Sequence, residues 1–235
     1  MDIKFIARQE NYAPFLELFP PQPSNKILPE WYKKLNRTFK MDTNLEGKTI
    51  KSCPAVQDIL TAGFVIPLWS KFEFASVKDD NNFVVSQHWR FHAATATNEE
   101  LKYHLGSHSQ EQIGDMGIKT TLDGAVLKLP LPYTIKVPKG YNIMYSDPFY
   151  HFRKDIRCLP GIVEADKWGQ ITFPFEALKS NFIIEAGTPL VHCLVYKREK
   201  EAINIITEKG THEDYYQSYK ETFELFSTEK NYRTK

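Results

Sequence analysis

Apolar and polar residues alternate most clearly between Phe64 and His92. In the first half of this segment, the apolar residues of one face are Phe64, Ile66, Leu68, Phe72 and Phe74. In the second half, residues 83–92 have apolar side chains on one face and polar ones on the other, namely Ser86, His88, Arg90 and His92. A period of two predicts strands. Because DDNN at 79–82 is typical of a turn, the pattern predicts a β-hairpin.

Residues 125–198 show the same alternation, interrupted by prolines that suit strand edges and bends. The segment GIVEADKWGQITFPF, at 161–175, predicts a hairpin whose turn lies near Asp166 to Gly169. We expect Glu164 and Asp166 to lie at its exposed end. We expect Gly169 to hold the turn, because glycine adopts positive φ at little steric cost. Short strands with glycine turns at this spacing predict a barrel or a folded sheet.

A helix is predicted over residues 54–62. Pro54 suits its first turn, Gly63 suits its C-terminal stop, and Ser52 is the candidate cap. A shorter helix is predicted after Thr97 by a capping-box pattern. The following residues, 107–124, show no clear period and predict a connector.

The C-terminal segment 212–226 also predicts a helix, with Thr211 as its cap. Aromatic residues fall on one stripe of this helix, at Tyr215, Tyr219, Phe223 and Phe226. An aromatic stripe at helical spacing favours packing. We expect this stripe to pack on the body of the protein or on a partner subunit.

Together these elements predict an α+β protein that is mainly β, with an additional N-terminal β-hairpin and peripheral helices. The expected organisation is an irregular strap over 1–50 and a helix, hairpin and connector over 51–124. A β core follows over 125–200 and an aromatic helix over 201–235. We expect these parts to form one compact domain.

Composition narrows the classes of function. The 235 residues include 30 basic and 29 acidic ones, which gives a net charge of +1. This balance argues against a broad electrostatic surface for nucleic acid or an anionic membrane. No apolar stretch approaches the roughly 20 residues that span a bilayer, and the first residues lack a signal-peptide core. The 3 cysteines form no CxxC pair. A reduced, cytoplasmic protein is therefore expected.

Four histidines form two pairs with metal-ligand spacing, His88 with His92 and His104 with His108. Such nitrogen ligands suit Zn²⁺ or Fe²⁺. Residues four apart in a strand are separated by about 13 Å, however, so the first pair does not easily share one ion. The alternatives are a metal-dependent enzyme and solvent-facing histidines.

The face with His88 and Arg90 also suggests single-stranded nucleic acid, with Trp69 as a stacking platform. The balanced charge favours an ordinary solvated sheet face instead. A cysteine nucleophile has little support. Cys193 lies in an apolar strand, while Cys158 is expected to be more exposed.

Three blocks between residues 134 and 197 carry a resemblance. They are TIKVPKGY at 134–141, GIVEADKWGQI at 161–171 and FIIEAGTPLVHCLV at 182–195. In this order they resemble the dUTPase and dCTP-deaminase family of β-clip folds. The resemblance implies a β-clip core over 125–200 and a homotrimer with composite sites.

The same resemblance implies a nucleotide site. Glu164 stands where the family's acid orients or deprotonates the attacking water, and Asp166 falls in frame beside it. Lys167 occupies the position of the base-stacking aromatic, and in an active enzyme the next residue, Trp168, would stack on the base. Arg153 and Lys154 are the candidate phosphate ligands. Mg²⁺ is the implied cofactor only for an active enzyme.

The chain departs from the family at its phosphate loop and its C-terminal arm. SDPFYHFRK, at 146–154, stands in place of the family's R-S-G loop, and Asp147 would repel a triphosphate. An aromatic helix replaces the glycine-rich arm. The leading hypothesis is therefore a non-catalytic protein for assembly or partner binding. The alternative is a nucleotide-processing enzyme with altered specificity.

A longer pattern runs through most of the chain. LPEWYKKL, CPAVQDILTAGFVIPLW, VPKGYNIMYSDPF, GIVEADKW and AGTPLVHCLVYKRE, in this order, resemble uncharacterised proteins of tailed bacteriophages. The resemblance implies a phage or host protein as partner, and a place in the cytoplasm of the host cell or in the virion.

Overall fold

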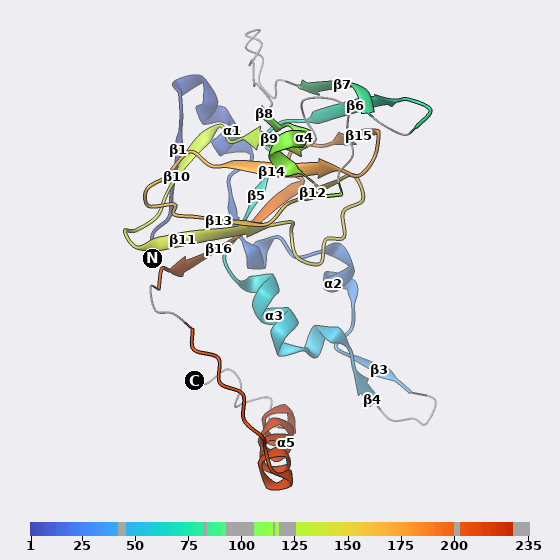
Figure 1. Cartoon of the computed structure of the whole chain (residues 1–235), viewed down its shortest axis with the longest axis vertical. Coiled ribbons are helices and arrows are strands. Elements are labelled where there is room, and N and C mark those ends of the chain that lie inside the picture. Colours follow the sequence, from blue (N-terminus) through green and yellow to red (C-terminus); the bar gives the residue numbers. More distant parts are fainter. Residues whose placement is uncertain are drawn as a thin grey trace. The chain divides into compact units, whose positions relative to one another are not determined.

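A computed structural model describes residues 1–41, 46–81, 84–92, 106–114, 116–117, 126–199 and 203–227. The chain divides into two units, Met1–Arg198 and Glu199–Lys235. The first unit is mainly β and consists of antiparallel sheets, as the alternation predicts (Figure 1). None of the helices in the described residues is long and apolar enough to cross a membrane.

The largest sheet of the first unit has five strands. Their order is β13 (Gly161–Val163), β11 (Tyr141–Ser146), β16 (Pro189–Lys197), β5 (Phe64–Pro67) and β2 (Gln22–Pro23). A two-stranded sheet pairs β1 (Lys4–Ala7) with β10 (Tyr133–Lys136). The centre of β16 is buried on both faces, so its residues LVHC form a continuous buried run.

A second sheet has four strands. Their order is β12 (Ile156–Cys158), β14 (Thr172–Ala177), β9 (Val126–Pro130) and β8 (Gly106–His108). The alternating residues Phe173 and Phe175 of β14 are buried beside Leu129 of β9 in the main core. Each such side chain stabilises the fold by about 1.5–3 kcal/mol relative to full exposure.

The third sheet has the order β15 (Asn181–Ile184), β6 (Phe72–Lys78) and β7 (Val84–Phe91). Figure 1 shows these three strands side by side at one end of the unit. The β6–β7 pairing confirms the predicted hairpin turn. The prediction of one hairpin over 64–92 that extends the main sheet is wrong, because β5 and β6 belong to different sheets.

Between β5 and β6 the chain leaves one sheet and enters another, and backbone hydrogen bonds hold it there against the β15–β16 connection. The N–H of Leu68 donates to the carbonyl of Thr188 at 2.8 Å, and the N–H of Gly187 donates to the carbonyl of Leu68 at 2.7 Å. The β5–β6 and β15–β16 connections therefore pass between the sheets side by side. Gly187 has a φ of 81° in this connection, a conformation that glycine adopts at little steric cost.

Residues 161–175 do not form the predicted hairpin. Ile143 of β11 pairs with Val163 of β13, whereas Leu129 of β9 pairs with Phe173 of β14. The connection between β13 and β14 thus crosses from one sheet to the other. Ala165, within this connection, is buried in the core shared by the sheets.

The expected role of Gly169 is also corrected, because its φ is not positive. Its carbonyl accepts from the N–H of Ile135 at 2.9 Å, so the backbone lies against β10. A Cβ at Gly169 would lie 2.5 Å from Cγ2 of Thr134. Glycine is required here by this close approach rather than by the turn conformation.

The N-terminal segment contains more regular structure than an irregular strap. Its elements are η1 (Glu10–Tyr12), α1 (Ala13–Leu18), η2 (Ser24–Lys26), α2 (Glu30–Lys34), the paired strands β3 (Thr38–Lys40) and β4 (Glu46–Lys48), and η3 (Ile50–Ser52). Each is too short to show a period in the sequence. The indole N–H of Trp31 donates to the carbonyl of Tyr150 at 2.8 Å, which ties α2 to the β11–β12 loop.

The predicted helix at 54–62 is confirmed as α3 (Pro54–Thr61), and Gly63 follows it with a φ of 70°. The cap is Cys53 rather than Ser52, whose hydroxyl donates to the carbonyl of Arg37 at 3.1 Å.

The expected connector at 107–124 contains part of β8 and a one-turn helix, α4 (Gln110–Ile113). The predicted helix after Thr97 lies outside the described residues.

The second unit contains α5 (His212–Ser227). The N–H of Asp214 donates to Oγ1 of Thr211 at 3.2 Å, and the N–H of Thr211 donates to Oδ2 of Asp214 at 2.7 Å. These reciprocal bonds satisfy one free N–H group of the first turn, that of Asp214, and the N–H of the cap residue. The predicted helix and its Thr211 cap are therefore confirmed.

Candidate functional site

The three-stranded sheet has one face outside the core. Its inner face carries Phe72, Phe74 and Phe182, which are buried in the main cluster. Successive residues of a strand point to opposite faces. The outer face therefore carries two rows set by the register. One row is Ile183, Glu73 and Arg90; the other is Asn181, Ala75 and His88.

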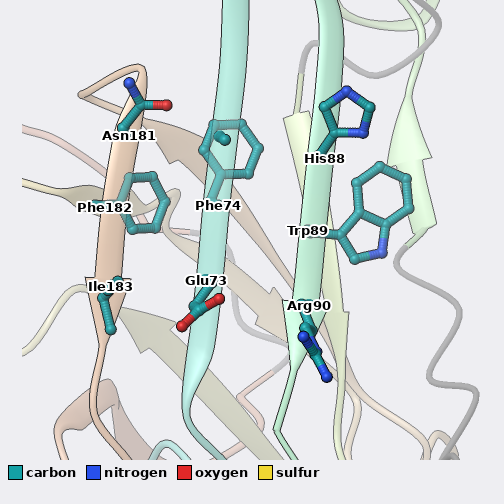
Figure 2. A pocket seen from close by; sticks show the side chains of 9 residues that line it. Glu73, Phe74, His88, Trp89, Arg90, Asn181, Phe182 and Ile183 are labelled. Atoms are coloured by element: carbon teal, nitrogen blue, oxygen red, sulfur yellow. The ribbon is translucent and has the colours of Figure 1, made fainter.

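An open depression lies on this sheet, with a cavity volume of about 610 Å³ (Figure 2). Its lining comes from all three strands and consists of Glu73, Phe74, Ala75, His88, Trp89, Arg90, Asn181, Phe182 and Ile183. Ala75, the smallest of these, stands between Asn181 and His88 in the register, so the longer side chains surround a low point. Ile183 is 55% exposed at its edge.

Of the charged side chains on this face, Glu73 has ion-pair partners within the described residues and Arg90 does not. Glu73 Oε1 lies 3.0 Å from His92 Nε2 and 3.8 Å from Lys71 Nζ. Arg90 stands directly across from Glu73 in the register and is exposed. Its guanidinium makes no hydrogen bond or ion pair to another residue that the structure describes. This face therefore offers a cation, a carboxylate and an apolar side chain within one row.

Glu164 and Asp166 lie at a different place, in the connection between β13 and β14. Asp166 Oδ2 accepts from the N–H of Gly140 at 2.8 Å, and Oδ1 pairs with the guanidinium of Arg198. The Asp166 side chain is only 8% exposed. The Gly140 hydrogen bond and the Arg198 charge lower the pKa of this carboxyl below its usual value. Asp166 therefore joins the start of β11 to the end of β16.

Glu164 is more exposed but is also paired. Its carboxylate contacts the ammonium of Lys167 and lies 3.5 Å from the Arg198 guanidinium. The Lys167 hydrogen bond is the main cause that lowers its pKa. The backbone N–H groups of Lys167 and Trp168 both donate to the carbonyl of Glu164, which makes a helical turn. This turn leaves the Trp168 ring exposed to solvent.

Arg198 completes this cluster from the end of β16. Its Nε donates to Oδ1 of Asn142 at 2.8 Å, and Asn142 Nδ2 donates to the Tyr196 hydroxyl at 3.3 Å. The guanidinium thus contacts two carboxylates and one amide. No pattern in the sequence indicates these contacts, because Arg198 lies 32 residues beyond Asp166.

Arg153 and Lys154 do not join Glu164 within one copy of the chain. They follow the end of β11, whereas Gly140, which binds Asp166, precedes its start. A strand of this length separates the two places by about 20 Å. The Arg153 guanidinium is nearly buried and donates to Asp155 Oδ1 and to the carbonyl of Pro189. Lys154 is exposed.

The histidine pairs do not form a metal cluster in the described residues. No group of three or more His, Cys, Asp or Glu side chains there is placed to hold an ion. His88 Nε2 lies 3.1 Å from Ser86 Oγ, and His108 Nδ1 lies 3.3 Å from Gln112 Oε1. His104 lies outside the described residues. A metal site that uses His104 stays a prediction.

Two further predictions are corrected by burial. Cys158 is buried rather than exposed, and burial raises the pKa of its thiol and of the Cys193 thiol, so neither is a ready thiolate. Trp69 is fully buried and stacks on Phe91, so it is no platform for nucleic-acid bases. The exposed indole near Arg90 is Trp89, which lies beside β7 on the side away from β6 (Figure 2).

Comparisons with known proteins add little to this geometry. No protein-family model matches the chain, and no curated protein matches it in sequence. Among solved structures, the native dUTPase of EIAV is similar at 12% identity and a TM-score of 0.34. The similarity covers 64% of this chain and 87% of that chain. So low a score does not establish a shared fold, so the β-clip core stays a prediction. None of these comparisons points to a bacteriophage.

Proposed function

We propose that this protein is a non-catalytic assembly protein whose copies join through the outer face of the β15-β6-β7 sheet. The observation that carries the proposal is the self-complementary character of this face. It has a protruding apolar side chain, Ile183, a low point at Ala75, and two opposite charges, Glu73 and Arg90, in neighbouring strands.

The apolar part of the face suits a second copy of the chain. A two-fold axis that runs parallel to the sheet, between two such faces, brings the same patch of both copies together, so residue i meets residue j and j meets i. Ile183 of each copy can then fill the depression over Ala75 of the other. Val77, 54% exposed and two residues beyond Ala75 on the same face, extends the apolar surface. Exposed apolar side chains on a rigid sheet are typical of interfaces.

The charged part of the face supports the same arrangement. Glu73 and Arg90 stand opposite each other on paired strands, so rotation by 180° brings each beside its opposite in the second copy. Such exposed pairs contribute more to orientation and specificity than to affinity. A face of a single charge would instead repel its copy.

The nucleotide-enzyme alternative has less support from the geometry. A catalytic carboxylate must be free to accept a proton from water. The Glu164 and Asp166 carboxylates are paired with Lys167 and Arg198 instead. The candidate phosphate ligand Arg153 is engaged by Asp155.

Sedimentation velocity over a range of micromolar concentrations tests the assembly proposal. We expect the wild type to self-associate and Ile183→Arg to weaken association at least about tenfold, because the apolar side chain that fills the depression is lost and a charged one must be desolvated in its place. Ile162→Arg is the matched control, since Ile162 is equally exposed on β13. A monomeric wild type, or equal effects of both substitutions, would contradict the proposal. The mass also tells a dimer from the trimer that the dUTPase resemblance implies.

A thermal-shift screen with dUTP, dCTP and Mg²⁺ tests the enzyme alternative. Binding at one hundred times the Kd would stabilise the protein by about 2.7 kcal/mol. We expect no shift. A clear shift, followed by turnover that is lost in Glu164→Gln, would replace the assembly proposal with the enzyme.

A further inference from the structure

The C-terminal unit carries an aromatic surface of its own. Tyr215, Tyr219 and Phe223 of α5 are 70%, 58% and 63% exposed. Their rings stack along the helix, with centroids 6.5 Å and 6.3 Å apart. Tyr216, on the neighbouring turn, is also exposed. An isolated helix of about 16 residues is marginal in water, so α5 gains most of its stability from whatever covers this surface.

The spacing of the aromatic residues is that of a coiled coil. Tyr216, Tyr219, Phe223 and Phe226 follow one another at intervals of three, four and three residues. This order fills the a and d positions of two heptads, the positions that pack between paired helices. His212 takes the d position before them.

The charges at the edges of this seam determine the orientation. With Tyr216 at a, both Glu213 and Lys220 occupy e positions, while Tyr215 and Thr222 occupy g positions. In an antiparallel pair, e positions face e positions, so each Glu213 meets Lys220 of the other copy. In a parallel pair, e positions face g positions, and no ion pair forms. The charge pattern therefore matches an antiparallel pair of identical helices.

The register follows from the same pairing. When Glu213 faces Lys220, Tyr216 lies in one layer with Tyr219 of the second copy, and His212 lies in one layer with Phe223. Tyr216, Tyr219 and Phe223 then each meet another ring across the seam, counting the His212 imidazole. Aromatic pairs of this kind stabilise beyond the area that they bury.

We propose that α5 pairs antiparallel with α5 of a second copy of the chain, through Tyr216, Tyr219 and Phe223 and with Glu213 facing Lys220. This surface is separate from the outer face of the β15-β6-β7 sheet and goes beyond the function proposed for that face. A chain with two self-complementary surfaces binds two neighbours, so copies extend into chains or close into rings.

A charge-swap cycle in the full chain tests this pairing apart from the sheet. All variants are made in the Ile183→Arg chain, in which we expect association through the sheet face to be weakened. We expect Glu213→Lys and Lys220→Glu each to weaken dimerisation about tenfold, because both symmetric ion pairs become repulsive. The double substitution should restore it. Glu221→Lys, at an outward f position, is the matched control and should have no effect. Circular dichroism checks that the helix content is unchanged.

The outcomes separate the two surfaces. If the Ile183→Arg chain still dimerises and the charge cycle behaves as stated, the helix pairs whatever the sheet does. If neither single swap changes the dimer, or if the double substitution fails to restore it, the pairing of α5 is wrong. A monomeric Ile183→Arg chain would also overturn it, while leaving the sheet proposal intact.

Disulfide trapping tests the orientation directly. Chains with Glu213→Cys are mixed with chains with Lys220→Cys and oxidised, with the unsubstituted chain as control for the native thiols. We expect a cross-link between the two kinds of chain and little cross-linking within either kind. If Glu213→Cys chains cross-linked with one another as readily as with Lys220→Cys chains, the antiparallel arrangement would be wrong.

Discussion

The acidic turn at residues 164–168 and the outer face of the β15-β6-β7 sheet both combine a carboxylate with an arginine. In the turn these side chains bind each other, whereas on the outer face the arginine side chain stays exposed. Asp166 is 8% and Arg198 is 18% exposed, and the two contact each other, Gly140 and Asn142. On the outer face, Glu73 is partly exposed, and Arg90 is exposed without a partner among the described residues.

The difference shows that residue types alone do not identify a site. A carboxylate whose lone pairs all accept from protein donors holds the fold together, because a ligand would have to displace those donors. A charge that still has unused hydrogen-bonding capacity at the surface can bind something else. The following predictions test whether the turn is structural and the face is free.

The largest effect is expected at Gly169. Gly169→Ala should lower the free energy of unfolding by about 1–3 kcal/mol, since its Cβ would overlap the Thr134 side chain. Chemical denaturation with guanidinium gives this value. Adding Thr134→Ser removes the Cγ2 methyl group that obstructs the alanine and should recover most of the loss.

The double substitution separates two explanations for the glycine. A loss that Thr134→Ser does not relieve would mean that the backbone conformation at Gly169, and not the close approach of β10, requires glycine. The turn would then be held in the way that the sequence alone suggests.

The next effect concerns the two carboxylates of the turn. Asp166→Asn should lower the denaturant midpoint clearly, because it weakens the contacts with Gly140 and Arg198 at a nearly buried position. Glu164→Gln should shift the midpoint much less, because this side chain is far more exposed. Equal shifts, or a larger one for Glu164→Gln, would place Glu164 in a tighter environment and favour a catalytic role for it.

The acid dependence of stability tests the same contacts. The folded pKa of Asp166 is lowered, chiefly by the Gly140 hydrogen bond, so its contribution is complete above its unfolded pKa of about 4. That contribution is lost as the pH falls through the lower, folded pKa. We expect wild-type stability to decline below pH ~4 and the decline to be shallower in Asp166→Asn. Parallel declines for the two proteins would show that Asp166 has no stabilising partner.

Much of the local structure follows from sequence, but the assignment of strands to sheets does not. The alternation of Phe72 and Phe74 correctly indicates a buried face, because a strand repeats every two residues. The same alternation around 161–175 shows which residues are buried without showing which strand they pair with. For this reason β13 and β14 looked like one hairpin although they lie in two sheets.

The site was predictable to a similar extent. His88 and Arg90 share a face in the sequence pattern and in the structure. Ile183 was missed, because it reaches Glu73 through the long-range pairing of β15 with β6. The Asp166 partners were missed for the same reason, since Gly140 and Arg198 lie 26 and 32 residues away in the chain.

The smallest effect is expected on the outer face itself. Arg90→Ala should change the free energy of unfolding by no more than about 0.5 kcal/mol, because the side chain is exposed and makes no hydrogen bond or ion pair to another described residue. Its alternating neighbour Phe91, which is partly buried against the core, is the contrast: Phe91→Ala should cost about 1.5 kcal/mol. Denaturation below the concentration at which copies associate keeps assembly from adding to either value. A loss above about 1 kcal/mol in Arg90→Ala would show that this guanidinium is already used by the fold. In that case the outer face would resemble the acidic turn, and it would not be a surface that is free to bind a second copy.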